Sequence, residues 1–236
     1  MPSSERYGPL VHRSVHHAAT LLIAGVVAFL AGNVLTQWAW DYYRSSPTPV
    51  YSLTQNYISD LGAIHCGTIG GRYVCSPWHL VFSVSVILLG LLTILGVLLI
   101  QSAFPTRQTR TVGLGLLVVS GIGSIGVGLS PEDYNLTVHS ISALLGFAGA
   151  GLALIALALA MLRDTRWDGY RVFTALCGLV DLGALGLFIS HTWGPIGVGG
   201  MERLIVAPVL LWSVVISVHL LRIPTYSSPK LPKVAG

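Results

Sequence analysis

Six long runs of apolar residues constrain the fold of this chain more than any other feature of its sequence. Each run approaches the roughly 20 residues that an α-helix needs to cross a hydrocarbon core of about 30 Å. Inside a bilayer the backbone must satisfy its own hydrogen bonds, and a helix does so within a single segment. We therefore predict an all-α integral membrane protein that folds as a bundle of six transmembrane helices. The expected spans are residues 18–40, 78–102, 111–129, 138–162, 172–191 and 203–221.

Composition favours one transmembrane domain over residues 1–236. Hydrophobic residues make up 53% of the chain and charged residues 9%, whereas about a quarter of a soluble protein is charged. The net charge of +4 comes from basic residues scattered through short loops. Because these residues form no stripe, they indicate how the protein sits in the membrane rather than nucleic-acid binding.

The basic residues predict the orientation of the bundle. Arg44, Arg72 and Arg203 fall on one side of the spans, and the other ten of the 13 Lys and Arg residues fall on the opposite side. Basic residues concentrate in cytoplasmic loops. We therefore expect a multi-pass protein of the cell membrane with both termini in the cytoplasm, including a tail at residues 223–236. The loops after the first, third and fifth spans then face outward.

Two of the three cysteines lie in the first of these outward loops. Cys66 and Cys75 are nine residues apart, with Gly67, Gly70 and Gly71 between them to allow a tight return. An outward compartment is oxidising enough for a disulfide to persist. Closing so short a loop would stabilise the fold by about 2–3 kcal/mol. We predict a disulfide that pins this loop, the alternative being two free thiols.

Polar side chains that could carry chemistry gather at the predicted outward ends of the spans. Helix ends on one side of a bundle converge, so these groups can face a common cavity. Acids and imidazoles at this depth are costly unless they are paired or hydrated, and together they supply acid–base catalysis. Alternatively, they only cap helices and reach toward water. The candidate catalytic residues are Asp60, His79, His139, His191 and Glu202.

Residues near these candidates could bind a substrate. Arg203 offers a planar fork that suits a lipid phosphate or a carboxylate, although an ion pair with Glu202 explains it equally well. Asn56 and Ser59 could instead cap a short helix around Asp60. The aromatic residues could stabilise a cation or form an interfacial belt. The candidate substrate-binding residues are Asn56, Tyr57, Ser59, Trp78, Trp193 and Arg203.

Asp181 stands apart because it falls near the middle of the fifth span. An ionisable group at that depth indicates a functional role facing the bundle interior. It could relay protons or hold a cation, or it could simply be protonated and hydrogen-bonded to Ser120, Ser124 or Asn33.

A metal is not expected from this sequence. The alternative is a zinc site of three protein ligands, drawn from Asp60 and three histidines at span ends, with one position left open. No pair of outward histidines has the local spacing typical of zinc ligands. We therefore expect no cofactor and no metal site.

The outward loop and the start of the sixth span suggest a family. The segment from Asn56 to Gly62, the Arg72–Pro77 segment with His79, and Gly200–Arg203 leading into Trp212 resemble the domain-of-unknown-function 998 family. The likeness covers about residues 18–221. It implies six or seven membrane spans and no general activity. The family is distantly similar to the Frag1/DRAM membrane proteins, some of which act in lipid remodelling, and that link is an analogy.

Two classes of function fit these observations. The first is a membrane-embedded enzyme that acts on a lipid-like or isoprenoid substrate at the outer interface, with membrane lipids as its surroundings. Its reaction would be hydrolysis or transfer on a lipid head group, or acid-initiated cyclisation of a polyprenyl chain. The alternative is a non-catalytic lipid or ion carrier, or an accessory subunit of a membrane complex, for which the glycine-rich third span and Asp181 are the evidence.

Overall fold

Six helices of membrane-spanning length form the body of the protein over the residues that the structure describes. The computed structural model describes residues 9–45 and 47–222, so the expected tail at 223–236 lies outside the described residues. The prediction of an all-α protein with six apolar helices is confirmed, whereas the cytoplasmic location of the termini stays a prediction. The helices are α1 (Pro9–Tyr43), α2 (His79–Ile100), α3 (Gln108–Leu129), α4 (Leu136–Met161), α5 (Tyr170–Ile189) and α6 (Gly197–Leu221).

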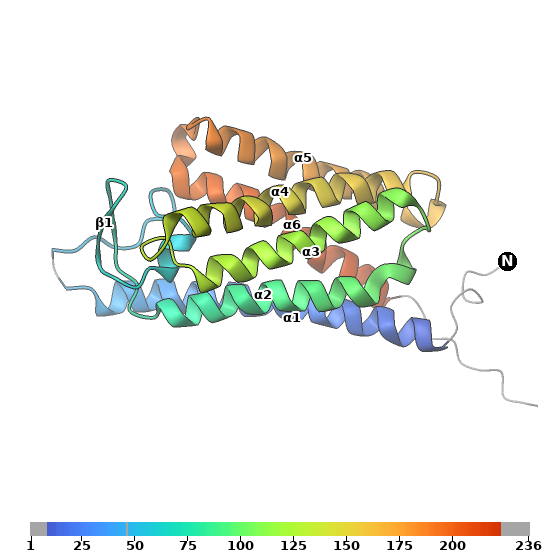
Figure 1. Ribbon diagram of the computed structural model, residues 1–236, viewed down its shortest axis with the longest axis horizontal. Coiled ribbons are helices and arrows are strands. Elements are labelled where there is room, and N and C mark those ends of the chain that lie inside the picture. The colour runs from blue at the N-terminus through green and yellow to red at the C-terminus, as the bar shows by residue number, and fades with distance from the viewer. Residues whose placement is uncertain (1–8, 46, 223–236) are drawn as a thin grey trace, which may run out of the picture.

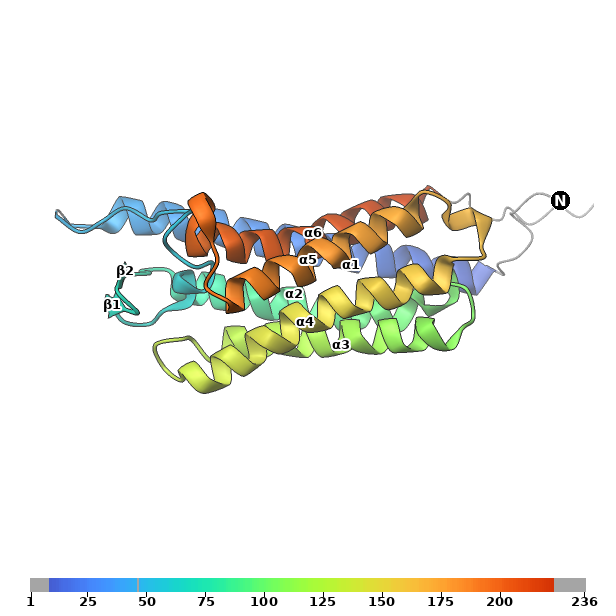
Figure 2. The same cartoon turned by 90° about the horizontal axis from the view of Figure 1, so that it is seen from above.

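The helices follow one another around the bundle (Figures 1 and 2). Each packs against the next one in the chain, and α6 closes the ring by packing against α1. The segments after α1, α3 and α5 therefore meet at one end of the bundle. We call this the hairpin end, because a short β-hairpin stands there.

Glycines allow close contact between neighbouring helices. A Cβ on Gly123 of α3 would lie 2.8 Å from the Cα of Gly146 on α4, and nearer still to the Ser142 carbonyl. At the same contact the Ser120 hydroxyl donates a hydrogen bond to the Gly146 carbonyl at 2.7 Å. In lipid, helices associate through such packing and interhelical hydrogen bonds. Apart from Gly115, the glycines of α3 therefore form its contacts with α2 and α4, and the helix is continuous.

The segment between α1 and α2 folds over the hairpin end. A short 3₁₀ helix, η2 (Ser59–Gly62), is followed by strands β1 (Gly67–Ile69) and β2 (Arg72–Val74), which pair in antiparallel register. Gly70 and Gly71 form the turn with φ of 53° and 81°, values that suit glycine in a two-residue hairpin. The predicted Cys66–Cys75 disulfide is present and closes the hairpin at its base.

The glycine contact predicts opposite effects for two matched substitutions in α3. Gly123→Ala should destabilise the bundle by about 1–3 kcal/mol, because the new methyl group overpacks the contact with α4. Gly115→Ala should leave stability unchanged or raise it by about 0.5–1 kcal/mol, because its methyl group meets open space. Thermal unfolding of the two purified variants in one detergent measures the difference. Equal Tm values would contradict this account of the α3–α4 contact.

Candidate functional site

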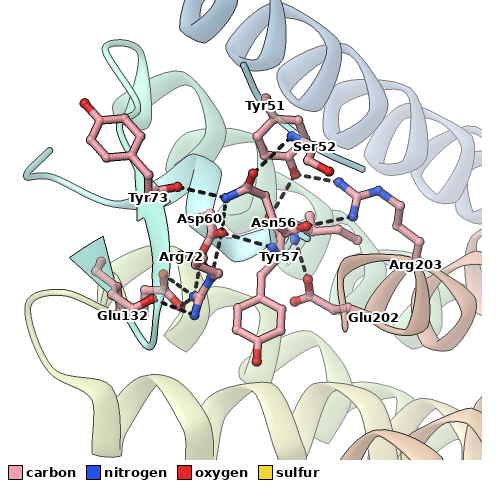
Figure 3. A network of polar contacts seen from close by, with 12 residues as sticks. Tyr51, Ser52, Asn56, Tyr57, Asp60, Arg72, Tyr73, Glu132, Glu202 and Arg203 are labelled. Carbon is pink, nitrogen blue, oxygen red and sulfur yellow. Dashed lines mark hydrogen bonds and ion pairs between the residues drawn. The ribbon is translucent and has the colours of Figure 1, made fainter. Parts of the chain in front are cut away.

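The centre of the hairpin end is the carboxylate of Asp60, which is fully buried in η2. Arg72 approaches it from β2, with Nε at 2.9 Å from Oδ2 and Nη2 at 2.6 Å from Oδ1. The Asn56 amide and the Tyr57 backbone N–H donate to Oδ2 at 2.8 and 3.0 Å (Figure 3). A carboxylate has about four acceptor sites. The acceptor sites of the Asp60 carboxylate are therefore all occupied, and its bonds to Arg72 link the hairpin to η2.

Arg72 also binds a second carboxylate. Its Nη2 lies 2.9 Å from both Glu132 oxygens, and Glu132 comes from the segment between α3 and α4. The guanidinium carbon also lies 3.9 Å from the centre of the Tyr57 ring, a cation–π contact. One cation thus joins the hairpin, η2 and the α3–α4 segment. The sequence shows that Arg72 and Glu132 are charged residues, but it does not show that they lie in the site.

Two acids share this one cation, so one of them favours the protonated form. Burial, together with the hydrogen bond and the negative charge of Asp60, raises the pKa of Glu132 to about 9 against the opposing charge of Arg72. For Arg72, burial alone would lower the pKa, but the hydrogen bond to Asp60 and the charge of Glu132 outweigh it and raise the pKa. Glu132 is therefore a carboxylic acid that holds its proton at neutral pH.

A second arginine fixes α6 to the same segment. Arg203 Nη1 donates to the carbonyls of Gly199, Leu53 and Asn56 at 2.8, 3.0 and 3.1 Å. Its Nη2 donates to the Tyr51 hydroxyl, which in turn donates to the Tyr57 carbonyl at 2.8 Å. The predicted role of Arg203 in substrate binding stays a prediction. In the described structure its fork holds the chain in place.

Glu202 precedes Arg203 and points to the opposite side of the segment between α1 and α2 (Figure 3). It is 7% exposed, and its Oε2 accepts a hydrogen bond from the Ile58 N–H. No direct contact between Glu202 and Arg203 appears among the hydrogen bonds and ion pairs of the described residues. The Glu202–Arg203 ion pair suggested by the sequence is therefore not formed in the described structure. Each of the two residues binds the segment between α1 and α2 separately, and Glu202 also lines a cavity.

His139, in the first turn of α4, is held in one orientation. Its Nδ1 lies 2.8 Å from the Ser130 carbonyl, and the side chain is buried. A carbonyl can only accept, so Nδ1 carries a hydrogen. In the neutral imidazole Nε2 then keeps its lone pair, and this is the form that acts as a general base.

Two adjoining cavities bring these groups together. The outer cavity, about 470 Å³, is lined by Tyr57, Ser59, Glu132, His139 and Glu202 and by apolar residues of α4 and α5. Some of those apolar residues, such as Leu144 and Ile189, are also exposed on the outside of the bundle. The inner cavity, about 90 Å³, lies deeper and is mostly apolar. The outer cavity thus joins acids and an imidazole to a surface that faces the bilayer.

The other predicted site residues lie elsewhere. His79 Nδ1 lies 3.3 Å from the Ser76 carbonyl, and His191 is exposed just after α5. Trp78 packs edge-on against Trp38 at 5.6 Å, as in an interfacial aromatic cluster. Trp193 donates to the Phe188 carbonyl at 3.2 Å. None of these four residues lines either cavity.

Zinc would require the predicted histidines to meet Asp60. Of Asp60, His79, His139 and His191, only His139 lines the two cavities. Over residues 9–45 and 47–222 the structure places no group of three or more His, Cys, Asp or Glu side chains in an arrangement that could hold a metal ion.

A family model described as "Protein of unknown function (DUF998)" matches residues 23–219, which is most of the chain. The chain belongs to the DUF998 family. The match extends from α1 to α6 and contains every residue of the site. Neither a curated protein nor a solved structure matches this DUF998 chain significantly.

The raised pKa of Glu132 predicts how stability depends on pH. In the unfolded chain this group ionises near its ordinary pKa of 4.5, and in the folded protein near 9. The folded state therefore binds more protons between these values, and the free energy of unfolding should fall as pH rises from about 4.5 to about 9. Glu132→Gln mimics the protonated form and should flatten that fall, measured as Tm in detergent, where each kcal/mol corresponds to about 2–4 °C.

Asp133 provides the matched control for this experiment. Burial would raise its pKa, but hydrogen bonds from the backbone N–H groups of His65 and Ile64 outweigh this and lower it. Asp133→Asn should therefore leave the alkaline loss of stability intact. The assignment to Glu132 fails if Glu132→Gln keeps the wild-type profile, or if Asp133→Asn flattens it as much.

Proposed function

We propose that this DUF998 protein is a membrane-embedded enzyme that acts on a lipid-like substrate by general acid–base catalysis at the outer membrane interface. One observation carries the proposal. Glu132 and His139, which flank the start of α4, and the distant Glu202 of α6 line one cavity, whose apolar walls reach the lipid-facing surface of α4 and α5. The hairpin end is taken as the outward end, as the distribution of basic residues predicts.

The walls of the outer cavity define the class of substrate. At about 470 Å³ it falls within the range of small-molecule sites, about 300–1,000 Å³. Its polar groups lie at the hairpin end, and Phe147, Leu185 and Phe188 line its apolar part. An amphiphile fits this division, with its polar group beside Glu132 and His139 and its chain along α4 and α5. Such a molecule would enter sideways from the bilayer.

The reaction that best uses these groups is hydrolysis or transfer on the polar head. His139 Nε2 takes the proton from the attacking water or hydroxyl, whose oxygen forms the new bond. Glu132 gives its proton to the oxygen that leaves as the old bond breaks. Transfer of the proton from His139 back to Glu132 restores both groups. Arg72 holds Glu132 in place, and Asp60 acts through Arg72 as a positioning residue.

A second chemistry uses Glu202 instead. Glu202 also lines the inner cavity, where Phe29, Phe82 and Phe147 present aromatic side chains. Aromatic faces stabilise cations, so an acid at this place could start the cyclisation of an isoprenoid chain. This reaction would depend on Glu202 and would not need the base His139. Substitution of Glu202 should therefore abolish cyclisation, whereas substitution of His139 should abolish only the reaction on the polar head.

The test compares His139→Gln, Glu132→Gln and Glu202→Gln with wild type, with His191→Gln as the matched control outside both cavities. Each protein is reconstituted in lipid nanodiscs, and turnover of phospholipid and epoxy-isoprenoid substrates is followed by mass spectrometry. Loss of a general acid or base costs about 10²–10⁴-fold in rate. We expect His139→Gln and Glu132→Gln to lose at least about 100-fold on a phospholipid substrate, and His191→Gln to match wild type.

Each other outcome counts against head-group chemistry. Loss confined to Glu202→Gln, on the isoprenoid substrate alone, would establish cyclisation instead. Wild-type rates in both His139→Gln and Glu132→Gln would show that the pair does no chemistry. If wild type turns over neither substrate class and still binds lipid in the outer cavity, the protein is a carrier or an accessory subunit.

A further inference from the structure

Asp181 has no partner in the described structure. Its side chain is 1% exposed, and neither carboxylate oxygen has a hydrogen-bond partner among residues 9–45 and 47–222. It lies near the middle of α5, about 12 Å from the last residue of that helix at 1.5 Å per residue. An unpaired carboxylate this deep in a membrane protein is costly. Asp181 therefore requires a partner that the side chains around it do not supply.

The inner cavity shows what kind of partner is missing. Asp181 lines it together with Ser120 and Ser124 of α3. Ser120 already donates to the Gly146 carbonyl at 2.7 Å, and Ser124 donates to the Ser120 carbonyl at 3.1 Å. Each hydroxyl has one hydrogen, so both oxygens can now only accept. The serines therefore suit a protonated carboxyl or a water molecule, and they cannot stabilise a bare carboxylate.

The surroundings favour a proton over a larger cation. The titratable groups that face Asp181 are Cys177 on α5, and His139 of α4 and Glu202 of α6 across the inner cavity, whose lining holds no Lys or Arg. Oxygen-bound metal cations such as Ca²⁺ take six or more ligands, but most of this lining is apolar. A volume of about 90 Å³ holds several water molecules. Water and a proton satisfy Asp181 without those ligands.

The same cavity connects Asp181 to the hairpin end. Glu202, His139, Ser59, Phe147 and Ala143 line both the inner and the outer cavity, so the two adjoin there. A chain of water molecules from Asp181 would reach polar partners at Ser120 and Ser124 and then at Glu202. Ala143, a small residue, lies where the two cavities meet.

We propose that Asp181 is an intramembrane proton-binding group, which exchanges its proton with the Glu202–His139 end of the bundle through water held in the inner cavity. This site goes beyond the catalytic proposal and does not depend on it, because proton binding at Asp181 needs no substrate. It is a separate function of the bundle interior.

Infrared spectroscopy of the purified full-length protein tests the proposal. A protonated carboxyl has its own C=O stretching band, which shifts when deuterium replaces the proton. We expect wild type to show such a band that Asp181→Asn lacks and that Glu202→Gln and Glu132→Gln keep. Once pH exceeds the pKa of the group, the band should weaken by about tenfold for each pH unit. In D₂O it should shift promptly.

The route is tested by Ala143→Leu, which fills the junction of the two cavities, and the D₂O shift should then slow at least about tenfold. The proposal is overturned if wild type and Asp181→Asn have the same carboxyl bands at every pH. It is overturned equally if the Asp181 band does not shift in D₂O. An unchanged exchange rate in Ala143→Leu, with the fold intact, would rule out the route from the hairpin end.

Discussion

The guanidinium of Arg72 lies between two buried carboxylates, and the hairpin end depends on this arrangement. Asp60 and Glu132 carry two potential negative charges against one cation. A buried charge without a partner is costly, so the excess is removed by a proton on Glu132. The ion pair therefore creates a carboxylic acid beside an apolar cavity. The disulfide-closed hairpin positions Arg72. The hairpin therefore also determines the protonation of Glu132.

The fold was largely predictable, because its cause is local. Six apolar runs of the right length predict six helices whatever their packing, and the glycines between Cys66 and Cys75 predict a tight return. The ion-pair network was not predictable, because its cause is long-range. Arg72 and Glu132 are 60 residues apart, and the sequence shows three basic and several acidic residues in the same loops without showing which of them meet.

The histidines show why convergent helix ends are a weak guide to a site. Ends that meet in space place residues at a similar depth, but the rotation of each helix decides which side chain faces inward. His139 faces the cavities because Ser130 receives its Nδ1–H. His191 follows the last turn of α5 with φ of 57° and is exposed. The sequence gives depth from span boundaries, but rotation follows from packing against neighbours, which a single chain read alone does not reveal.

The positions of the arginines explain why the acidic residues of the two cavities need bound protons or water. Arg72 and Arg203 both use their donors on the loop side of the hairpin end, where they hold η2 and α6 in place. Arg72 also contacts Glu132, whereas Glu202 and Asp181 line the cavities without an ion pair in the described part of the chain, and the lining of the two cavities includes no Lys or Arg. Acids in a low-dielectric space without cations are stable only when protonated or hydrated. The same asymmetry that anchors the loop therefore leaves the apolar interior with groups that can gain and lose protons, which both acid–base catalysis and intramembrane proton exchange require.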